Sequence, residues 1–325
     1  MTDDLEIAVL RGNIHGTTVD EYAEAIRERV PDCPVRVART PADERDLLAT
    51  APIATGLSID DDLVEAASQL ELFACAYAGT GHLPLEALSR AGVAVTNASG
   101  VHGPNIAEHV IGAILSFTRR FHVGARRQRR REWRSYQTYE LEGSTVAVVG
   151  LGAIGQAICE RLEPFGVELL GIRRSPEKGG PVDEIFGYDE NALHEVLART
   201  EYLVLACPLT DETRGMIDDA AFETLPSSSV VINVARGPVI DTDALVSTLQ
   251  RNGVRGASLD VTDPEPLPES HPLWTFDNVQ ITPHNSGYTP RYYDRLADIL
   301  ARNVERIRES GSYENLENLE NQVLP

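Results

Sequence analysis

The hydrophobic pattern of the second half of the chain consists of short, continuous apolar runs separated by amphipathic stretches. Continuous rather than alternating apolar character is what a parallel strand buried on both faces requires. The runs predict strands at residues 145–150, 167–172, 201–206, 229–235, 256–261 and 278–283. Strands that alternate with helical stretches in this way predict a doubly wound α/β domain.

The first hundred residues repeat the same pattern more weakly. Their apolar runs predict strands at residues 6–12, 34–39, 52–57, 70–76 and 92–97. We therefore expect a second, smaller α/β domain, and a chain of 325 residues is long enough for both. A further amphipathic stretch at residues 291–310 predicts a helix that returns to this first domain.

A helical pattern connects the two sets of strands. Pro104 suits a helix start, and apolar residues recur at helical spacing, at Ile106, Val110, Ile111, Ile114, Leu115 and Phe121. We predict one long linking helix around residues 104–134.

The later part of this segment is rich in arginine: Arg119, Arg120, Arg126, Arg127, Arg129, Arg130, Arg131 and Arg134. Such a face could bind nucleic acid or contact acidic surface on a partner subunit. The chain carries 50 acidic and 29 basic residues, so most of its surface would repel a phosphate polyanion. This balance favours the subunit contact, and we expect no nucleic-acid partner.

The net charge of −21 comes with a single lysine, Lys178. An acidic, lysine-poor surface is typical of proteins from high-salt cytoplasm, where screening shortens like-charge repulsion; an ordinary acidic protein is the alternative. No apolar run is long enough to span a bilayer, and the N-terminus is acidic where a secretory signal would be basic, so we expect a cytoplasmic protein without membrane contact.

The cysteines are widely spaced, which disfavours a zinc site and a disulfide framework alike. We expect buried thiols and no metal at Cys33, Cys75, Cys159 and Cys207.

A glycine-rich loop follows the predicted strand at 145–150. Gly150, Gly152 and Gly155 stand in G-x-G-x-x-G order directly before a helical stretch. In this context the first glycine permits a tight turn, the second lets backbone N–H groups approach a pyrophosphate, and the third allows close helix packing. We expect a dinucleotide phosphate here, contacted also by the intervening Ala153 and Ile154.

The end of the next predicted strand bears on the choice of cofactor. An enzyme specific for NAD places an acidic residue there to bind the adenosine ribose, but this chain has Arg173, followed by Arg174 and Ser175. Two guanidinium groups and a hydroxyl can bind a 2′-phosphate. The sequence predicts NADP(H) rather than NAD(H), and a solvated basic turn is the alternative.

Candidate catalytic residues follow the later strands. Arg236, Asp260, Glu265 and His284 should meet at the carboxyl edge of the sheet, where Gly152 also lies. An arginine can bind a carboxylate and polarise a carbonyl, and a histidine beside a glutamate can exchange a proton near neutral pH. The set suits hydride transfer to a keto acid.

Several motifs, in order and spacing, resemble the D-isomer-specific 2-hydroxyacid dehydrogenase family over nearly the whole chain: "GLGAIG", "CPLTDETRGMID", "NVARGPVIDTDAL", "LDVTDPEPLPESHPLW" and "TPHNSG". The resemblance implies two Rossmann-like domains, with the dinucleotide-binding domain (101–287) inserted into a substrate domain (1–100 and 288–325). It also implies an active site in the cleft between them and a homodimer built around the linking helix.

The resemblance also assigns roles to residues. Arg236 would bind substrate, Glu265 and His284 would handle the proton, and the loop "YAGTGHLPLEAL" would bind the substrate carboxylate through the amides of Ala78 and Gly79. The remaining cofactor contacts would be Cys207, Pro208, Thr213, Val234, Ala235, Arg236, Asp260, His284 and Gly287. A small buried thiol is an equal alternative for Cys207. Two positions depart from the family pattern: Gly81 replaces a common acidic residue, and Arg173 replaces a common aspartate.

These observations predict an NADP(H)-preferring D-2-hydroxyacid dehydrogenase that works mainly as a 2-ketoacid reductase, with NAD(H) as a weaker cofactor. Within the class, glyoxylate or hydroxypyruvate reductase and phosphoglycerate, formate or phosphite dehydrogenase are alternatives. Formate-specific relatives carry a glutamine where Glu265 stands, which disfavours that activity. Outside the class, the alternative is an NAD(P)-sensing regulatory protein that resembles the C-terminal-binding corepressors.

Overall fold

The computed structural model describes residues 5–14 and 16–321 and divides the chain into two compact units. One unit combines Met1–His102 with Thr289–Pro325, and the other is the continuous segment Gly103–Tyr288. The predicted substrate domain (1–100 and 288–325) and dinucleotide-binding domain (101–287), with their roles, stay predictions. Each unit is described by itself below.

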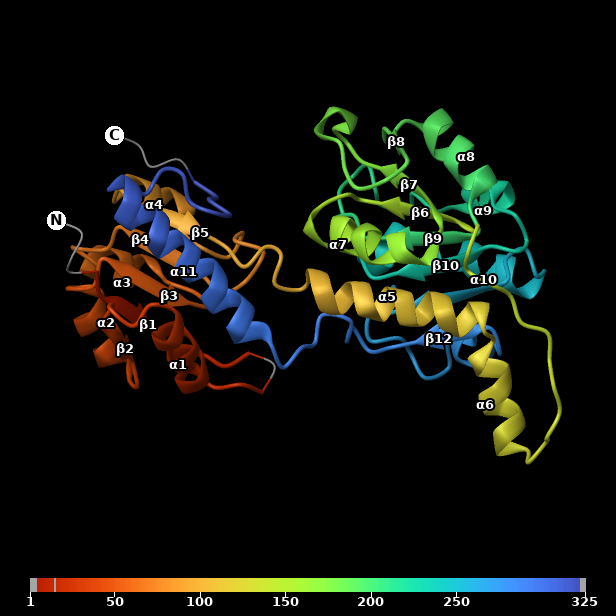
Figure 1. Ribbon diagram of the computed structural model, residues 1–325, viewed down its shortest axis with the longest axis horizontal. Coiled ribbons are helices and arrows are strands. Elements are labelled where there is room, and N and C mark those ends of the chain that lie inside the picture. Colours follow the sequence, from red (N-terminus) through yellow and green to blue (C-terminus); the bar gives the residue numbers. More distant parts are fainter. Residues whose placement is uncertain (1–4, 15, 322–325) are drawn as a thin grey trace. The chain divides into compact units, whose positions relative to one another are not determined.

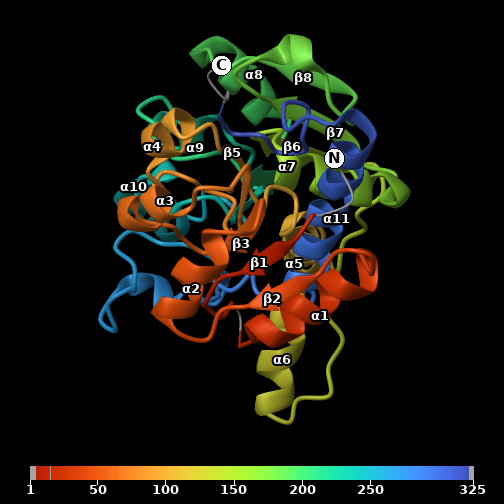
Figure 2. The ribbon, with the colours of Figure 1, turned by 90° about the vertical axis from the view of Figure 1, so that its left-hand side faces the viewer.

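The first unit is built on a parallel five-stranded sheet in the order β2-β1-β3-β4-β5. Its strands are β1 (Ile7–Val9), β2 (Val35–Val37), β3 (Ile53–Gly56), β4 (Leu72–Cys75) and β5 (Ala94–Thr96). Helices α1 (Val19–Arg29) and α11 (Tyr292–Ser310) pack in one hydrophobic core, and α2 (Pro41–Leu48), α3 (Asp61–Ala66) and α4 (Leu85–Arg90) in another. Figure 2 faces this unit, with these two groups of helices on opposite sides of the sheet.

The second unit contains a parallel seven-stranded sheet in the order β12-β11-β10-β9-β6-β7-β8. The strands are β6 (Thr145–Val149), β7 (Glu168–Ile172), β8 (Glu184–Phe186), β9 (Tyr202–Leu205), β10 (Val230–Asn233), β11 (Gly256–Leu259) and β12 (Val279–Ile281). Two parallel sheets confirm the predicted α/β class. The order reverses between β6 and β9, which is the switch point where doubly wound sheets bind ligands.

Residues that alternate along the strands divide between the two faces of this sheet. Val146 and Val148 pack with α5 (Gly103–Thr118) and α7 (Ala153–Leu162). Ala147 and Val149 instead face the core formed with α8 (Glu190–Arg199), α9 (Asp219–Thr224) and α10 (Thr242–Gln250). Figure 1 shows the two groups of helices on opposite sides of the sheet. Both faces are covered, which explains why the strands are apolar at nearly every position.

The prediction of a single linking helix around residues 104–134 is wrong. Two helices occupy the segment, α5 and α6 (Phe121–Arg129), and Arg120 between them is left-handed with φ +54°. The carbonyl of Thr118 accepts a hydrogen bond from the Tyr139 N–H at 2.9 Å instead of continuing the helical ladder. Phe121, which seemed to extend the apolar face, is exposed. A tertiary contact therefore ends a helix that local periodicity would prolong.

The edge strand β8 was not predicted. It has only three residues, and all of them retain exposure, so the segment lacks the apolar run that marks the central strands. The short helical turns are η1 (Glu163–Phe165), η2 (Pro176–Lys178), η3 (Gly237–Val239) and η4 (Pro272–Thr275). Within the described part of the chain, no helix is both long and apolar enough to cross a membrane.

Candidate functional site

The glycine-rich loop joins β6 to α7 at the switch point of the sheet. Gly150 has φ +97°, and a Cβ there would lie 2.6 Å from the backbone of Cys207. A Cβ on Gly155 would lie 1.9 Å from the carbonyl oxygen of Gly150. Glycine is required at both positions because backbone passes against backbone.

Gly152 differs from its two neighbours in the motif. A Cβ at this position would meet no protein atom within 4 Å. Gly152 is the N-cap of α7, it makes no capping side-chain hydrogen bond, and the first turn of the helix has no acidic residue. The helix terminus, with the N–H groups of Ala153 and Ile154, therefore faces open space suited to an anion, as a bound pyrophosphate requires.

The basic residues at the end of β7 are engaged within the protein. Arg173 donates a side-chain hydrogen bond to the carbonyl of Gly179. Arg174 forms an ion pair with Glu212, with Nε and Nη2 lying 3.0 and 2.7 Å from Oε2. Ser175 precedes η2 and makes no capping side-chain hydrogen bond. The contribution of Glu212 was not anticipated, because nothing in the sequence relates it to Arg174.

The segment after β9 packs beneath the glycine loop. Burial raises the pKa of the Cys207 thiol to about 11, so this thiol is protonated at neutral pH. Thr213 is buried and donates a hydrogen bond from Oγ1 to the carbonyl of Pro208 at 2.7 Å, which closes the turn. The thiol of Cys207 is a packing group rather than a nucleophile.

A histidine and a glutamate meet at the carboxyl edge of the sheet. The Nδ1 atom of His284 lies 2.7 Å from Oε1 of Glu265, and both side chains are nearly half exposed. A carboxylate can only accept a hydrogen bond, so Nδ1 carries the proton of this pair. The second ring nitrogen, Nε2, is then the atom available to a ligand.

Asp260 fixes the loop that carries His284. Its buried carboxylate accepts hydrogen bonds from the Thr282 hydroxyl (2.5 Å) and from the N–H groups of Asn285 (2.8 Å) and Ser286 (2.9 Å). Burial raises the pKa of Asp260, but these hydrogen bonds outweigh it and hold the pKa below its usual value. The N–H of His284, whose φ is +52°, donates to the Asp260 carbonyl at 2.8 Å. Asp260 therefore holds a strained turn in place.

Arg236 follows β10 at the same edge. Its exposed side chain donates a hydrogen bond to the carbonyl of Ala235 at 2.6 Å, while Val234 and Ala235 are buried. Asn233 accepts from the Ala235 N–H (3.0 Å) and donates to the Arg236 carbonyl (3.1 Å). Sequence reasoning missed this buried asparagine, whose role depends on a turn that composition does not reveal.

The predicted residues of the second unit thus follow parallel strands that end at one edge. Gly152 follows β6, Arg236 follows β10, and Asp260 follows β11. His284 and Gly287 come after β12, and the structure brings His284 into direct contact with Glu265. No group of three or more His, Cys, Asp or Glu side chains suited to a metal ion occurs among residues 5–14 and 16–321.

Ala78 and Gly79 belong to the first unit, where they form an exposed loop after β4. The next residue, Thr80, is buried and donates a hydrogen bond to Glu320 at 3.1 Å. Asn97 donates to the other carboxylate oxygen of Glu320 at 2.5 Å. The end of the described chain therefore braces the loop, a contact that sequence reasoning did not detect.

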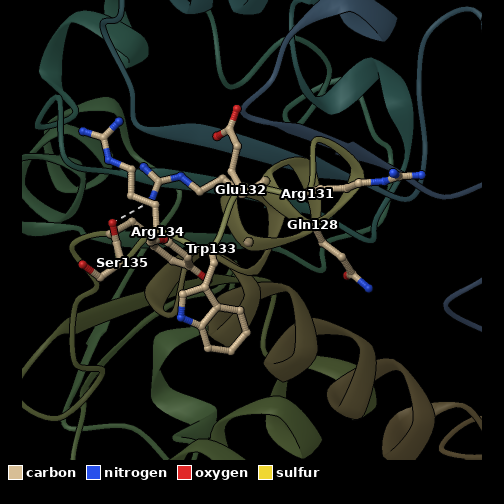
Figure 3. A pocket seen from close by; sticks show the side chains of 9 residues that line it. Gln128, Arg131, Glu132, Trp133, Arg134 and Ser135 are labelled. Carbon is tan, nitrogen blue, oxygen red and sulfur yellow. Dashed lines mark hydrogen bonds between the residues drawn. The ribbon is translucent and has the colours of Figure 1, made fainter.

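The arginine-rich segment, residues 119–140, is called the arm below. Arg127 donates hydrogen bonds to the carbonyls of Arg134 (2.7 Å) and Ser135 (2.6 Å), so the chain folds back along α6. The arm borders an open hollow of about 700 Å³. Trp133 is fully exposed beside it, and Figure 3 shows Trp133, Arg131 and Gln128 extending outward from the arm.

The strand order and the loop at its switch point define a dinucleotide-binding α/β protein. Comparison with known proteins narrows this class. Residues 111–286 match the NAD-binding domain of the D-isomer specific 2-hydroxyacid dehydrogenases. The chain belongs to this family. It is therefore an oxidoreductase with an NAD(P)-binding domain, and the family part of the predicted identity is confirmed.

Individual relatives support the assignment to this family. A glyoxylate reductase of Thermofilum pendens is 34% identical over 253 residues, covering 76% of this chain and 74% of that protein. Human glyoxylate reductase/hydroxypyruvate reductase is 32% identical over 255 residues, covering 76% of each. The crystal structure of a D-isomer specific 2-hydroxyacid dehydrogenase from Xanthobacter autotrophicus, in complex with NADPH and MES, has a TM-score of 0.74 and 28% identity, covering 97% of this chain and 98% of the other.

Alanine at Gly152 and alanine at Gly155 should have different effects, the first on cofactor binding and the second on stability. Gly152→Ala meets open space, so the midpoint of thermal unfolding should change by less than about 2 °C while the affinity for NAD(P)H falls. Gly155→Ala collides with the Gly150 carbonyl and should cost about 3 kcal/mol or more, lowering the midpoint by several degrees. Calorimetry and NAD(P)H fluorescence titration measure the two effects. A Gly152→Ala variant that binds cofactor normally would contradict the phosphate assignment.

Proposed function

We propose that the protein is an NADP(H)-preferring D-2-hydroxyacid dehydrogenase that works mainly as a reductase of small 2-ketoacids. The observation that carries the proposal is the hydrogen bond between His284 and Glu265 at the ligand-binding edge of a dinucleotide-type sheet. The open helix terminus at Gly152 fits a pyrophosphate, and the nicotinamide of the bound cofactor supplies the hydride.

His284 delivers the proton in this proposal. Glu265 holds Nδ1, which leaves Nε2 to donate to the substrate oxygen as it changes from ketone to alcohol. The four contacts of Asp260 to residues 282–286 keep the imidazole in one orientation. Asp260 is then a positioning residue as well as a predicted neighbour of the nicotinamide.

Arg236 binds the substrate in this proposal. Its guanidinium can pair with the substrate carboxylate and polarise the keto group, because charge develops on that oxygen during reduction. The backbone amides of the exposed residues Ala78 and Gly79 supply the remaining carboxylate contacts in this proposal. Val234, Ala235, Cys207, Pro208, Thr213 and Gly287 complete the proposed cofactor surface.

The preference for NADP(H) rests on the residues that follow β7. No carboxylate occupies the position after Ile172 where a ribose-binding acid would stand. Arg174 is paired with Glu212, but both side chains are more than half exposed, and such surface pairs are weak. A 2′-phosphate can therefore replace Glu212 on Arg174, and Arg173 and Ser175 lie next to it in the chain.

Glyoxylate and hydroxypyruvate are the first substrates to test, since relatives carry these names. Larger 2-ketoacids and 3-phosphoglycerate remain alternatives within the class. The rival outside it is a dinucleotide-sensing protein without turnover, and the complete set of Arg236, Glu265 and His284 favours an enzyme. The acidic, lysine-poor composition supports a protein that works at high salt. Activity assays in dilute buffer and in molar KCl test this.

The arm supports a homodimer. It presents arginines and an exposed tryptophan on a chain whose net charge is −21, so the acidic surface of a second copy is a complementary partner. We place the subunit contact on α5 and the arm.

Turnover tests the catalytic assignment. With NADPH and a panel of 2-ketoacids, the native protein should reduce at least one substrate, and His284→Ala should lower kcat by about 10²–10⁴-fold because the proton donor is lost. NADPH binding should change little. His194→Ala, a histidine of α8, serves as the control. Near-normal reduction by His284→Ala would exclude His284 as the proton donor, and no turnover with any ketoacid would favour the sensing protein.

Michaelis constants test the cofactor assignment. Arg173→Asp should raise KM for NADPH far more than for NADH. Glu212→Gln should lower KM for NADPH by up to about fivefold, because Arg174 no longer has a competing carboxylate. Glu177→Gln, in the same region, is the matched control. Equal changes in KM for NADPH and NADH would indicate that Arg173 and Arg174 form a solvated turn that does not bind the cofactor.

The two tryptophans allow a direct test of the dimer. Light scattering should give the mass of two chains for the native protein and for Trp274→Ser, whereas Trp133→Ser should shift towards one chain. In Trp274→Ser the emission of Trp133 should move to shorter wavelength as the protein concentration rises. A native protein that stays monomeric at every concentration would refute this contact.

A further inference from the structure

A second cavity lies at the edge of the seven-stranded sheet where β11 and β12 begin, near the start of α6. The glycine loop and His284 follow strand ends at the opposite edge. The cavity has a volume of about 170 Å³ and is lined by Phe117, Arg120, His122, Val123, Arg126, Tyr139, Arg255, Asp277 and Asn278. None of these residues belongs to the proposed active site.

Arg255 carries the argument. Its Nε and Nη2 atoms are fully buried, and neither has a hydrogen-bond partner among the residues that the structure describes. The guanidinium carbon lies 4.8 Å from the ring centre of Tyr139 and 5.1 Å from that of Tyr202. The two tyrosines stabilise the cation but accept neither of these N–H groups. A buried guanidinium edge without an acceptor is costly unless a ligand or water satisfies it.

The charges around the cavity are unbalanced. Arg120, Arg126 and Arg255 supply three guanidinium groups, and Asp277 supplies the single carboxylate. That carboxylate is paired with Arg126. Arg120 and Arg255 therefore remain without a carboxylate partner in the cavity lining, and an anion would complement them.

His122 adds a titratable group. Its Nδ1 is buried without a hydrogen-bond partner in the described part of the chain. Burial lowers the pKa of His122, and Arg120 and Arg126 lower it further, against smaller opposing effects of a hydrogen bond to the backbone of Ser116 and of Asp277. The ring is thus neutral at pH 7 in the absence of an anion.

We propose that this cavity binds one small oxyanion, held by the guanidinium groups of Arg255 and Arg120, with a small rotation of the Arg255 side chain bringing its covered Nε and Nη2 donors to the ion. Adjacent donors on one edge of a guanidinium match two oxygens of a single phosphate, sulfate or carboxylate group. The volume equals that of about six water molecules, which accommodates a small ion but not a nucleotide. The ion would connect α6 to the start of β11, and so fix the base of the arm.

Titration calorimetry at constant ionic strength tests the site on the full chain. Inorganic phosphate is the principal probe, and sulfate, acetate and chloride are compared with it. The titration is carried out with saturating NADPH, so that phosphate cannot bind at Arg173 and Arg174. Saturable binding of phosphate, sulfate or acetate is expected and identifies the preferred oxyanion. No saturable binding by any of the three, or chloride binding of equal strength, would overturn the proposal.

Three variants locate the binding. Arg255→Lys keeps the charge but loses the paired donors, so it should weaken binding by at least about tenfold. Arg120→Gln removes a neighbouring charge while leaving Arg255 against its tyrosines, and remains informative if Arg255→Lys fails to fold. Arg129→Gln, on α6 but outside the cavity lining, is the control and should bind normally. If Arg129→Gln weakens binding as much as Arg120→Gln, the anion is merely attracted to a basic surface.

A spectroscopic measurement gives an independent readout. A bound anion beside His122 should raise its pKa, which the ring-proton NMR signals report as a function of pH. Arg120, Arg126 and Asp277 act on the ring with and without the anion, so a change in the pKa of His122 on adding the anion reports the anion itself. The increase should appear in the native protein and be absent in Arg120→Gln at the same oxyanion concentration. An unchanged pKa at saturation would place the anion elsewhere.

Discussion

The carboxylate of Asp260 is the interaction on which the candidate site depends most. It is a buried charge, and hydrogen bonds from the Thr282 hydroxyl and two backbone N–H groups hold its pKa below the usual value despite the burial. Those donors come from the loop that carries His284, so the hydrogen bonds that stabilise the charge also fix the loop that positions the imidazole. The φ of +52° at His284 is a strained geometry that this set of hydrogen bonds can maintain.

The seven-stranded sheet determines where this loop can act. Because all its strands are parallel, Gly152, Arg236, Asp260 and His284 reach the same edge although more than a hundred residues separate the first from the last. The close passage of Gly155 over Gly150 then holds the start of α7 at that edge. The position of each group follows from topology, and only the final orientation depends on side-chain contacts.

The sequence was sufficient for features that arise from local pattern. Apolar runs predicted the central strands, and G-x-G-x-x-G predicted a loop between β6 and α7. Features that arise from tertiary contacts were missed: the end of α5 depends on Tyr139, the bracing of Thr80 depends on Glu320, and Glu212 reaches Arg174 from another loop. The short strand β8 was not predicted because a strand at an exposed edge of the sheet needs no apolar run. The predicted roles of the site residues are consistent with this geometry and await measurement.

The division of the chain has a consequence for its biosynthesis. The second unit is one continuous segment, so it can fold as soon as Tyr288 has left the ribosome. The first unit cannot, because Leu296, Leu300 and Val304 of α11 fill its core, and Glu320, which supports its loop, is synthesised later still. The five strands of this unit must therefore wait for a helix that is synthesised after the whole second unit. During that interval the apolar face that α11 later covers is exposed, and it is liable to aggregate.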